Sequence, residues 1–591
     1  MNLERRKSLT AGNVSALLCA LALAIPALGF EPVAARHGMV VTSEAHASEA
    51  GLEILQAGGN AVDAAVAVGF ALAVTHPYAG NIGGGGFMLI RMATGDAVVV
   101  DYREEAPAAA SRDMYLDAKA ELIPEASIVG ARAAGVPGTV AGLALAEQKY
   151  GRLGLARVLA PAIKLAQDGF PVSYALSQSL DSAQPLLSKF EESRHIFLRD
   201  GKLYEPGETF RQPELARALA QIAGRGPDAF YRGPIAEAVQ RTMQAYGGLI
   251  TLADLEQYQA KLRQPLEGHF RGFTALTVPP PSSGGVALLE MLNVLEPLDL
   301  GAPNSFDSMH LLTETMRRAY ADRAAYLGDA DFVAVPVKHL ISSEYAAKLR
   351  EQILTSKPEA PVQAGLAMTW RESSQTTHFS VVDAEGNAVA NTYTLNGGYG
   401  SGVTVEGAGF LLNDEMDDFA AKPGQPNMFG LVQGEANSIQ PRKRPLSSMT
   451  PTIVLGDSGP VGAALTSPEG AQQAAPLQPR ILTPVLVLGS PGGGTIINTV
   501  LQVLLNALVF KMDAREAVTS PRFHHQWMPD ELVVEDWGFS ADTLEKLRQA
   551  GYRISSRRGK IGECQAITID PKTGWRFGAA DPRGDGKAVG Y

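Results

Sequence analysis

A threonine at the start of a β-rich stretch is the feature that most constrains this chain. The stretch opens with Thr376-Thr377-His378-Phe379-Ser380 and continues through short runs of alternating character to Thr394. This alternation predicts two neighbouring strands that form a hairpin, with Thr376 at the edge of the first strand and Thr394 on the second. Because a β-branched residue is common at such a place, only its chemistry and its context can mark it as functional.

The chemistry of Thr376 changes if the chain is cut before it. Cleavage of the bond between Gln375 and Thr376 makes Thr376 an N-terminal residue. Its own α-amino group, with a pKa of about 8, can then take the proton of its hydroxyl nucleophile. The Thr394 hydroxyl is placed to orient the Thr376 oxygen. We therefore predict catalytic roles for both threonines, and we expect neither a metal ion nor a cofactor.

Size and charge narrow the class of protein. A chain of 591 residues exceeds the length at which one hydrophobic core keeps growing, so several lobes or one large layered unit are expected. The formal net charge of −11 argues against general affinity for nucleic acid or anionic membranes. These properties favour a protein that acts on small molecules.

The first 29 residues are typical of an export signal. A basic start at Arg5-Arg6-Lys7 precedes an apolar run that is too short for a stable membrane span, and small residues follow. Removal of residues 1–29 would take away Cys19 and leave Cys564 as the only cysteine, so no intrachain disulfide is expected. We predict a periplasmic or secreted bacterial protein in which Cys564 is a buried structural residue.

The order of elements along the chain predicts a layered α/β fold. Residues 47–74 have the composition of a buried helix pair, and the glycine run 81–86 leads into a strand at 87–91. A phosphate-binding loop requires the opposite order, in which a strand precedes the glycines and a helix follows them, so this run does not indicate a nucleotide site. Further helices are expected between 155 and 350, and strands dominate after 376. Residues 457–484, rich in Gly, Pro, Ala and Gln, read as a flexible loop insertion.

Several motifs in this order resemble the gamma-glutamyltransferase family of the N-terminal nucleophile hydrolase superfamily. They are the glycine run, Asp101-Tyr102-Arg103-Glu104, the turn Pro279-Pro280-Pro281-Ser282-Ser283-Gly284-Gly285, the Thr376-Thr377-His378 junction and the terminal Gly590-Tyr591. The resemblance spans residues 36–591. It implies an αββα sandwich built jointly by two chains after self-cleavage, a large subunit of residues 30–375 and a small subunit of residues 376–591.

The resemblance also implies roles for the site residues. A γ-glutamyl group ends in an amino acid, so its site must hold a carboxylate and an ammonium group. The planar fork of Arg103 suits the carboxylate, with hydroxyl donors from Ser447 and Ser448. The expected acceptors for the ammonium group are Asn396, Glu415 and Asp418. The backbone N–H groups of Gly492 and Gly493 would form the oxyanion hole.

The implied reaction has two stages. Thr376 first cuts its own precursor at the Gln375 carbonyl. It then attacks the γ-carbonyl of a donor such as glutathione, and the γ-glutamyl ester passes to water or to an amino acid or peptide acceptor. Position 415 is Glu where some bacterial members carry Gln, and residues 423–434 resemble the lid loop of such members.

Two other readings remain open from the residues. An acylase for cephalosporin-type side chains would use the same fold and nucleophile, but it would have no ammonium group for Asp418 to bind. A non-catalytic periplasmic amino acid binding protein would need Arg103 and Asp418 but not the threonine junction. The pair His524-His525 suggests a metal site only weakly, because adjacent strand residues face opposite sides, so packing is the preferred interpretation.

Overall fold

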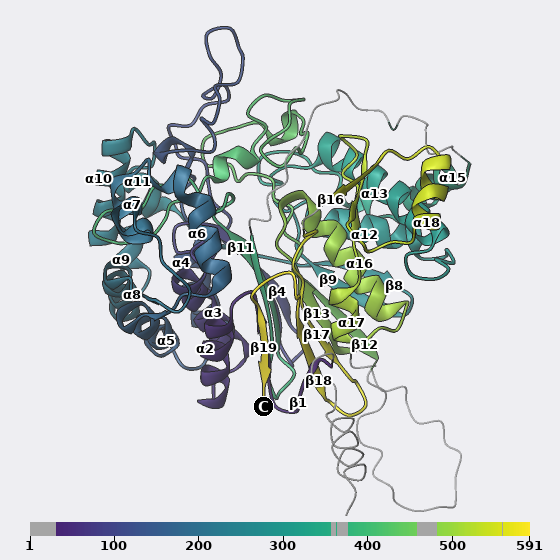
Figure 1. Cartoon of the computed structure of the whole chain (residues 1–591), viewed down its shortest axis with the longest axis horizontal. Coiled ribbons are helices and arrows are strands. Elements are labelled where there is room, and N and C mark those ends of the chain that lie inside the picture. The colour runs from purple at the N-terminus through teal and green to yellow at the C-terminus, as the bar shows by residue number, and fades with distance from the viewer. Residues whose placement is uncertain (1–30, 356–361, 363–375, 458–481, 558–559) are drawn as a thin grey trace, which may run out of the picture.

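The protein forms four layers, with two β-sheets packed face to face between two groups of helices (Figure 1). The computed structural model describes residues 31–355, 362, 376–457, 482–557 and 560–591. The predicted αββα sandwich is confirmed by these layers. The predicted signal segment, Gln375 and residues 458–481 of the predicted loop insertion lie outside the described residues.

Each central sheet has seven strands. The first has the order β1 (Val33–Ala35), β18 (Arg576–Ala580), β17 (Gln565–Ile569), β13 (Leu482–Gly489), β12 (Thr452–Asp457), β9 (Phe273–Thr277) and β8 (Leu266–Phe270). The second has the order β19 (Lys587–Gly590), β2 (Met39–Thr42), β10 (Thr377–Val382), β11 (Ala388–Thr394), β3 (Gly85–Arg91), β4 (Ala97–Asp101) and β7 (Lys261–Arg263). Small sheets pair β5 (Phe170–Pro171) with β6 (Thr209–Phe210), and β14 (Phe523–His524) with β15 (Leu532–Glu535) and β16 (Ile554–Arg557).

The helices form one group on each side of the sheets (Figure 1). One group contains α2 (Ala45–Gln56), α3 (Ala61–Thr75), α4 (Thr139–Tyr150), α5 (Leu155–Asp168), α6 (Tyr174–Leu187), α7 (Glu191–Leu198), α8 (Pro213–Arg225), α9 (Asp228–Tyr231), α10 (Pro234–Tyr246) and α11 (Leu252–Gln257). The other contains α12 (Gly284–Leu295), α13 (Phe306–Tyr326), α14 (Val337–Leu340), α15 (Ser343–Thr355), α16 (Ile496–Leu508), α17 (Ala514–Thr519) and α18 (Ala541–Gln549).

Both sheets mix strands from the two sides of Thr376. In the second sheet, β2 lies between β19 and β10, and β11 pairs with β3. In the first sheet, β1 pairs with β18 and β9 pairs with β12. The parts of the chain before and after Thr376 therefore share their sheets and do not form separate domains.

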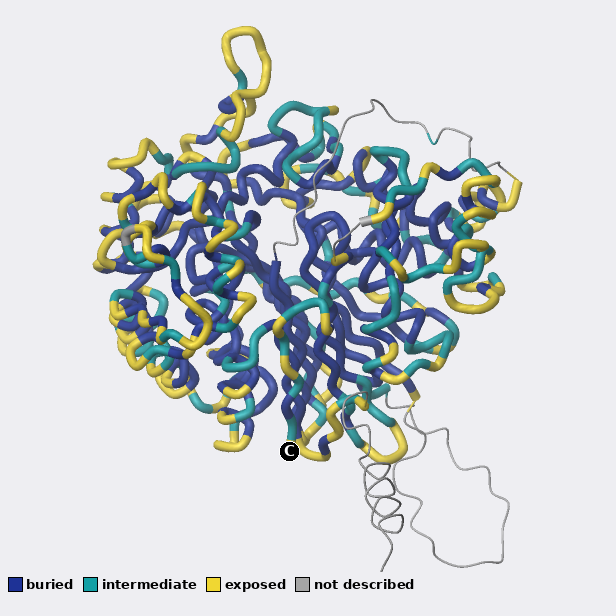
Figure 2. The backbone as a smooth tube through the Cα atoms, in the orientation of Figure 1, coloured by how far each residue is buried: buried dark blue, intermediate teal, exposed yellow. Residues whose placement is uncertain are grey.

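The core between the sheets is apolar, and the strands are the most deeply buried part of the molecule (Figure 2). Behind the second sheet, every residue of α3 is buried, as expected for a helix that is apolar all round. A capping box between Asn60 and Asp63 begins this helix. The Tyr393 hydroxyl donates a 2.8 Å hydrogen bond to the Gly69 carbonyl and so ties β11 to α3.

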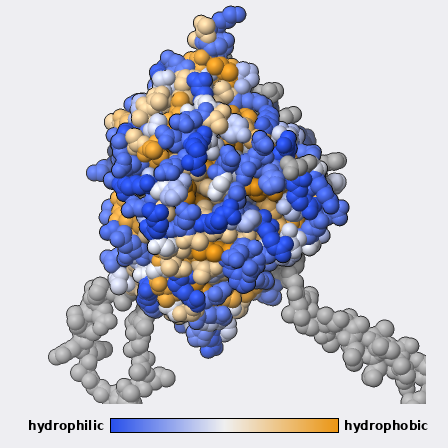
Figure 3. Space-filling view, turned by 90° about the vertical axis from the view of Figure 1, so that its left-hand side faces the viewer, coloured by the Kyte–Doolittle hydropathy of each residue, from blue (hydrophilic) through white to orange (hydrophobic). Residues whose placement is uncertain are grey.

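The outer helices meet solvent. On the face shown in Figure 3, hydrophilic residues cover most of the surface and hydrophobic residues occur between them in small groups. The loop around residues 116–122 extends beyond the rest of the molecule at the top of Figure 1 and is closed by a bridge between Leu116 and Leu122. The extended faces of the sheets, in contrast, are covered by helices or by each other.

The predicted loop insertion at 457–484 has narrower bounds than expected. Asp457 is the last residue of β12, and residues 482–484 already belong to β13. These two strands pair directly, with Asp457 opposite Leu482. The bounds predicted from the sequence therefore include one residue of β12 and three residues of β13.

Candidate active site

The hairpin of β10 and β11 places Thr376 and Thr394 together. Thr377 pairs with Tyr393 in the antiparallel register, so the next step along both strands brings Thr376 opposite Thr394. Both threonines are buried, at 6% and 2% exposure, and both line one narrow cavity. Its volume is about 20 Å³, which is room for about one water molecule.

The same cavity gathers residues from distant parts of the chain. It is lined by Arg103, Thr376, Thr394, Asn396, Glu415, Asp418, Phe429, Leu431, Ser447, Ser448, Met449, Gly493 and Ile496. Every binding residue proposed from the sequence is in this set, and Gly492 is the only proposed catalytic residue that is not. The convergence of these side chains on a buried threonine makes this cavity the candidate active site.

Two residues after Thr394, the chain turns sharply. The Thr394 hydroxyl oxygen accepts a 2.9 Å hydrogen bond from the Asn396 backbone N–H. Asn396 has a φ of +77°, a conformation that asparagine tolerates better than most residues. Its side-chain nitrogen donates to the Asp414 carbonyl at 3.0 Å, so its amide oxygen is the group that remains to accept from a ligand.

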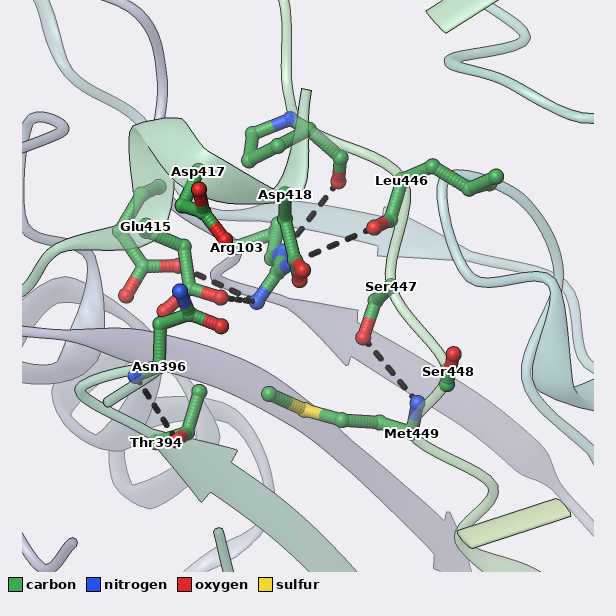
Figure 4. Close-up of polar contacts among 12 residues, drawn as sticks. Arg103, Thr394, Asn396, Glu415, Asp417, Asp418, Leu446, Ser447, Ser448 and Met449 are labelled. Atoms are coloured by element: carbon green, nitrogen blue, oxygen red, sulfur yellow. Dashed lines mark hydrogen bonds and ion pairs between the residues drawn. The ribbon is translucent and has the colours of Figure 1, made fainter. Parts of the chain in front are cut away.

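Arg103 occupies the centre of the polar side of the cavity (Figure 4). Its guanidinium group is fully buried and forms ion pairs with Glu415 and Asp418. Its Nε donates to the Pro445 carbonyl at 3.2 Å. The group expected to bind a carboxylate is thus paired with two of the groups expected to bind an ammonium ion.

Carboxyl groups outnumber the guanidinium around Arg103. Glu104 lies 3.8 Å from the same Arg103 nitrogen that pairs with Glu415. Burial raises the pKa of Glu104 to about 7, although Arg103 opposes the shift. Burial also raises the pKa of Glu415 well above its usual range, with Glu104 and Asp418 adding to the effect. The cluster therefore favours retention of protons, or of another positive charge, near neutral pH.

The hydroxyl groups of Ser447 and Ser448 each accept a hydrogen bond, one from a backbone N–H group and one from a second arginine. The Ser447 hydroxyl accepts from the Met449 N–H at 3.1 Å. The Ser448 hydroxyl accepts from Arg323 Nη2 at 3.1 Å, and Arg323 Nε donates to the Ser283 hydroxyl at 2.9 Å. Arg323 is 2% exposed, and it connects the predicted serine pair to the Pro-Pro-Pro-Ser-Ser-Gly-Gly turn.

The glycine segment that follows strand β13 of the first sheet contributes Gly493 to the lining of the cavity. Gly492 and Gly493 have φ values of +134° and +53°, which glycine adopts without a steric penalty. A Cβ atom at Gly493 would lie 2.6 Å from the Phe429 ring. Phe429 belongs to the segment 423–434, of which Phe429 and Leu431 line the cavity.

Other residues singled out in the sequence lie elsewhere. Cys564 is buried, and burial raises the pKa of its thiol to about 12. His524 contacts Gln526 and Asn498, whereas His525 contacts Asp530, so the two rings face different partners. Within the described ranges, no group of His, Cys, Asp and Glu could hold a metal ion. None of the helices in those ranges combines the length and apolar character needed to cross a membrane.

Two site residues were missed by the sequence interpretation. Glu104 follows Arg103 in the sequence, but an acidic residue at such a position is equally typical of the surface, so the sequence alone assigns it no role. Arg323 lies inside the long helix α13, where nothing in the local pattern distinguishes it from an exposed helical arginine. Only the packing of α13 against the turn at 279–285 reveals it.

Comparison with known proteins gives consistent relatives. The profile of the family described as gamma-glutamyltranspeptidase matches residues 47–591. A glutathione hydrolase proenzyme from Escherichia coli (strain K12) is 47% identical over 568 residues, which cover 95% of this chain and 93% of that protein. Acylase ACY 1 proenzyme from Pseudomonas sp. (strain SE83) is 36% identical, with coverage of 95% and 94%. The crystal structure of cephalosporin acylase from Bacillus halodurans aligns with a TM-score of 0.81 at 27% identity, covering 95% of this chain and 97% of that one.

Proposed function

Because this chain belongs to the gamma-glutamyltranspeptidase family, we propose that it is a self-processing glutathione hydrolase and γ-glutamyltransferase with Thr376 as its nucleophile. One observation carries the proposal. A buried threonine at the start of a strand shares a cavity with a buried arginine, two carboxylates and an oxyanion-type glycine. This is the set of groups that attack on the side chain of a γ-glutamyl compound requires.

The first reaction is the cleavage of the precursor. The Thr376 hydroxyl oxygen attacks the carbonyl carbon of Gln375, and the peptide nitrogen leaves as the α-amino group of Thr376. Water then hydrolyses the resulting ester and releases a chain that ends at Gln375 and a chain that starts at Thr376. The proenzyme relatives and the family support a precursor cleaved into two subunits.

The second reaction uses the new N-terminus. The Thr376 amine takes the hydroxyl proton as the oxygen attacks the γ-carbonyl carbon, and the proton passes to the leaving amine. Backbone N–H groups at Gly492 and Gly493 face the negative charge that develops on the carbonyl oxygen. Water or an acceptor amine then attacks the γ-glutamyl ester and restores the Thr376 hydroxyl.

The charge cluster supports an amino acid donor. A zwitterionic end that enters the cavity can place its carboxylate on Arg103 and its ammonium group on Glu415 and Asp418. Each buried charge then exchanges one partner for another, so no charge is left unpaired in the low-dielectric site. Ser447, Ser448 and Asn396 line the same cavity, so the two serines can add hydroxyl contacts to the carboxylate and Asn396 can accept from the ammonium group.

The acylase alternative makes a different demand on the same cavity. Acylase relatives match this chain at lower identity than the glutathione hydrolase proenzyme. A glutaryl side chain has the carboxylate but no ammonium group, so it would leave Glu415 and Asp418 without a new cationic partner. We therefore expect γ-glutamyl anilides to be cleaved at least a hundredfold faster than glutaryl anilides, measured as kcat/KM. Equal rates would favour the acylase reading.

Intact mass spectrometry tests the nucleophile. The wild-type protein should give a small fragment of residues 376–591, which is 591 − 375 = 216 residues long, and Thr376→Ala should remain uncut. Thr377→Ala is the matched control, because Thr377 is buried beside Thr376 and its hydroxyl has no hydrogen-bond partner among the described residues. Cleavage in Thr376→Ala would contradict the assignment. So would a loss of cleavage in Thr377→Ala as well as in Thr376→Ala.

We also propose that the enzyme is exported, on the strength of the signal-like pattern in residues 1–29. Cell fractionation of a bacterial host that expresses the full chain tests this. Activity retained in the cytoplasm, with an uncut N-terminus, would contradict it.

A further inference from the structure

The segment 423–434, here called the lid loop, is a hairpin that closes over the cavity. Pro426 and Val432 form a bridge at its base, and the Asn427 N–H donates to the Leu431 carbonyl at 3.2 Å. Phe429 and Leu431 line the cavity beside Thr376. The Phe429 ring lies against Gly493, close enough to exclude a Cβ atom there. The tip of the lid loop therefore covers the segment that would stabilise the oxyanion.

One side of the lid loop is attached to its own base. The Asn427 side-chain amide donates to Asp418 Oδ1 at 3.1 Å, and the Met428 N–H donates to Asp417 Oδ2 at 3.0 Å. Both acids lie a few residues before the lid loop in the chain. These contacts shape the hairpin, but they do not tie its tip to the opposite side of the cavity.

A glutamine from the opposite side reaches the tip. Gln526 follows β14 and is 5% exposed. Its side-chain nitrogen lies 3.3 Å from the Phe429 carbonyl oxygen and 3.1 Å from the Gly430 carbonyl oxygen. A third carbonyl, that of Met528, lies 3.3 Å from the same nitrogen. The tip of the lid loop is thus bound to the part of the molecule that also carries the oxyanion glycines.

A chain of hydrogen bonds fixes the orientation of Gln526. The Asn498 side-chain nitrogen, a donor, lies 2.8 Å from His524 Nδ1, and His524 Nε2 lies 2.9 Å from Gln526 Oε1. The His524 ring must then accept at Nδ1 and donate at Nε2, which leaves the Gln526 nitrogen facing the lid loop. Burial lowers the pKa of His524 to about 4, so the neutral ring keeps this arrangement at physiological pH.

We propose that Gln526 is a positioning residue that clasps the tip of the lid loop, keeps Phe429 on Gly493 and thereby shields the γ-glutamyl ester from water. The hydrogen bonds from Gln526 to the Phe429 and Gly430 carbonyls support the clasp. Its effect on turnover rests on the proposed function, since it requires an ester at Thr376.

The experiment compares Gln526→Met with Gln502→Met in the matured protein. Gln502 is an equally buried glutamine of the same region, but its side-chain nitrogen donates to the Asn498 and Phe523 carbonyls, not to the lid loop. Hydrogen exchange of peptides from residues 423–434, followed by mass spectrometry, should be about tenfold faster in Gln526→Met, as the loss of one or two hydrogen bonds implies. It should be unchanged in Gln502→Met.

Gln526→Glu provides a second variant that keeps the shape of the side chain. Its carboxylate can still accept from His524, but it offers the lid carbonyls no hydrogen until it is protonated. Lid exchange, relative to the wild type at the same pH, should be fast at pH 8 and slow again at low pH. This pH dependence would not arise from a general loss of packing, and it decides the proposal if Gln526→Met does not fold.

Turnover supplies the remaining test. At a fixed acceptor concentration, the share of donor hydrolysed should rise at least threefold in Gln526→Met and remain at the wild-type value in Gln502→Met. Wild-type lid exchange in Gln526→Met would overturn the clasp. Faster exchange with an unchanged product ratio would overturn its role in excluding water. If the wild type turned over no γ-glutamyl donor, the proposed function would fail, while the exchange data would still decide the clasp.

Discussion

Two buried arginines in neighbouring clusters differ in how their charge is balanced. Arg444 pairs with Asp101 at 2.5 Å and Glu105 at 3.1 Å, and Asp101 has a second cationic partner in Arg263 at 2.6 Å. Arg103, in contrast, is shared by Glu104, Glu415 and Asp418. Only the Arg103 cluster lines the cavity with Thr376.

The difference separates structural from ligand-binding charges. A cluster in which each carboxylate has its own cationic partner gains nothing from a further charge. A cluster with surplus carboxylates gains from an added cation, and a buried site with raised carboxyl pKa values is a typical place for one to bind. The comparison therefore predicts that changes at Arg444 act on stability and changes at Arg103 act on the donor.

The largest effect is expected from Arg444→Met. This change should lower the free energy of unfolding by about 3 kcal/mol, because Glu105 is left partly buried without its partner while Asp101 keeps Arg263. Urea denaturation in the uncleaved Thr376→Ala background would measure it on a single chain. The donor KM of the matured variant should change less than threefold, and a larger change would remove the distinction between the two clusters.

Arg103→Lys comes next. A lysine keeps the charge but loses the planar fork, so the KM for a γ-glutamyl donor should rise about a hundredfold, which corresponds to about 2.7 kcal/mol. Steady-state kinetics of the matured enzyme would measure it. Its loss of unfolding free energy should be smaller than that of Arg444→Met, and the reverse order would contradict the comparison.

Glu104→Gln tests the surplus of carboxyl groups through pH. The pKa of Glu104 is raised from 4.5 to about 7 in the folded protein, so its favourable contribution is complete below about pH 4.5 and is lost as the pH rises to about 7. A shift of this size corresponds to at most about 3 kcal/mol. The variant lacks the loss and should be on the order of 2 kcal/mol more stable than the wild type at pH 8. Urea denaturation across this pH range would measure it.

Glu105→Gln is the matched control for that measurement. Glu105 is adjacent in sequence but pairs with Arg444. Burial raises the pKa of Glu105 as well, although Arg444 opposes the shift, so its replacement should stabilise the protein at pH 8 less than Glu104→Gln does. Equal stabilisation by both variants would show that the two clusters are alike.

The smallest effect is expected from Ser448→Ala. Loss of one hydroxyl that binds Arg323 and faces the proposed carboxylate position should raise the donor KM about fivefold, or about 1 kcal/mol. Donor kinetics at saturating and limiting concentrations would separate KM from kcat. A fall in kcat with unchanged KM would place Ser448 in the chemical step instead.

Local patterns in the sequence predicted much of the scaffold around the nucleophile. The alternation in residues 376–394 is short-range information, and so are the buried helix pair at 47–74 and the glycine run before β3; all three appear in the structure. The layered αββα architecture followed from the resemblance to the family, whose motifs cover nearly the whole chain.

The partners of the site residues could not be predicted in the same way. Arg103 meets Glu415 across 312 positions of sequence, and no local pattern records such a pairing. Arg323 and Gln526 act through packing between elements, so each looks like an ordinary polar residue in the sequence. The bounds of the loop insertion were wrong by three residues at its end, because the Pro and Thr of β13 resemble loop residues until the sheet pairs them.

The interleaved strands have a consequence for the life of the enzyme after cleavage. Since β2 is held between β19 and β10, and β12 pairs with β9, the two products cannot separate without breaking both sheets. The proposed cleavage at Thr376 would thus change the covalent connection of the chain but not the neighbours of its strands. The two subunits of one enzyme molecule therefore always come from the same precursor. Molecules with different labels that are mixed after cleavage will not exchange subunits.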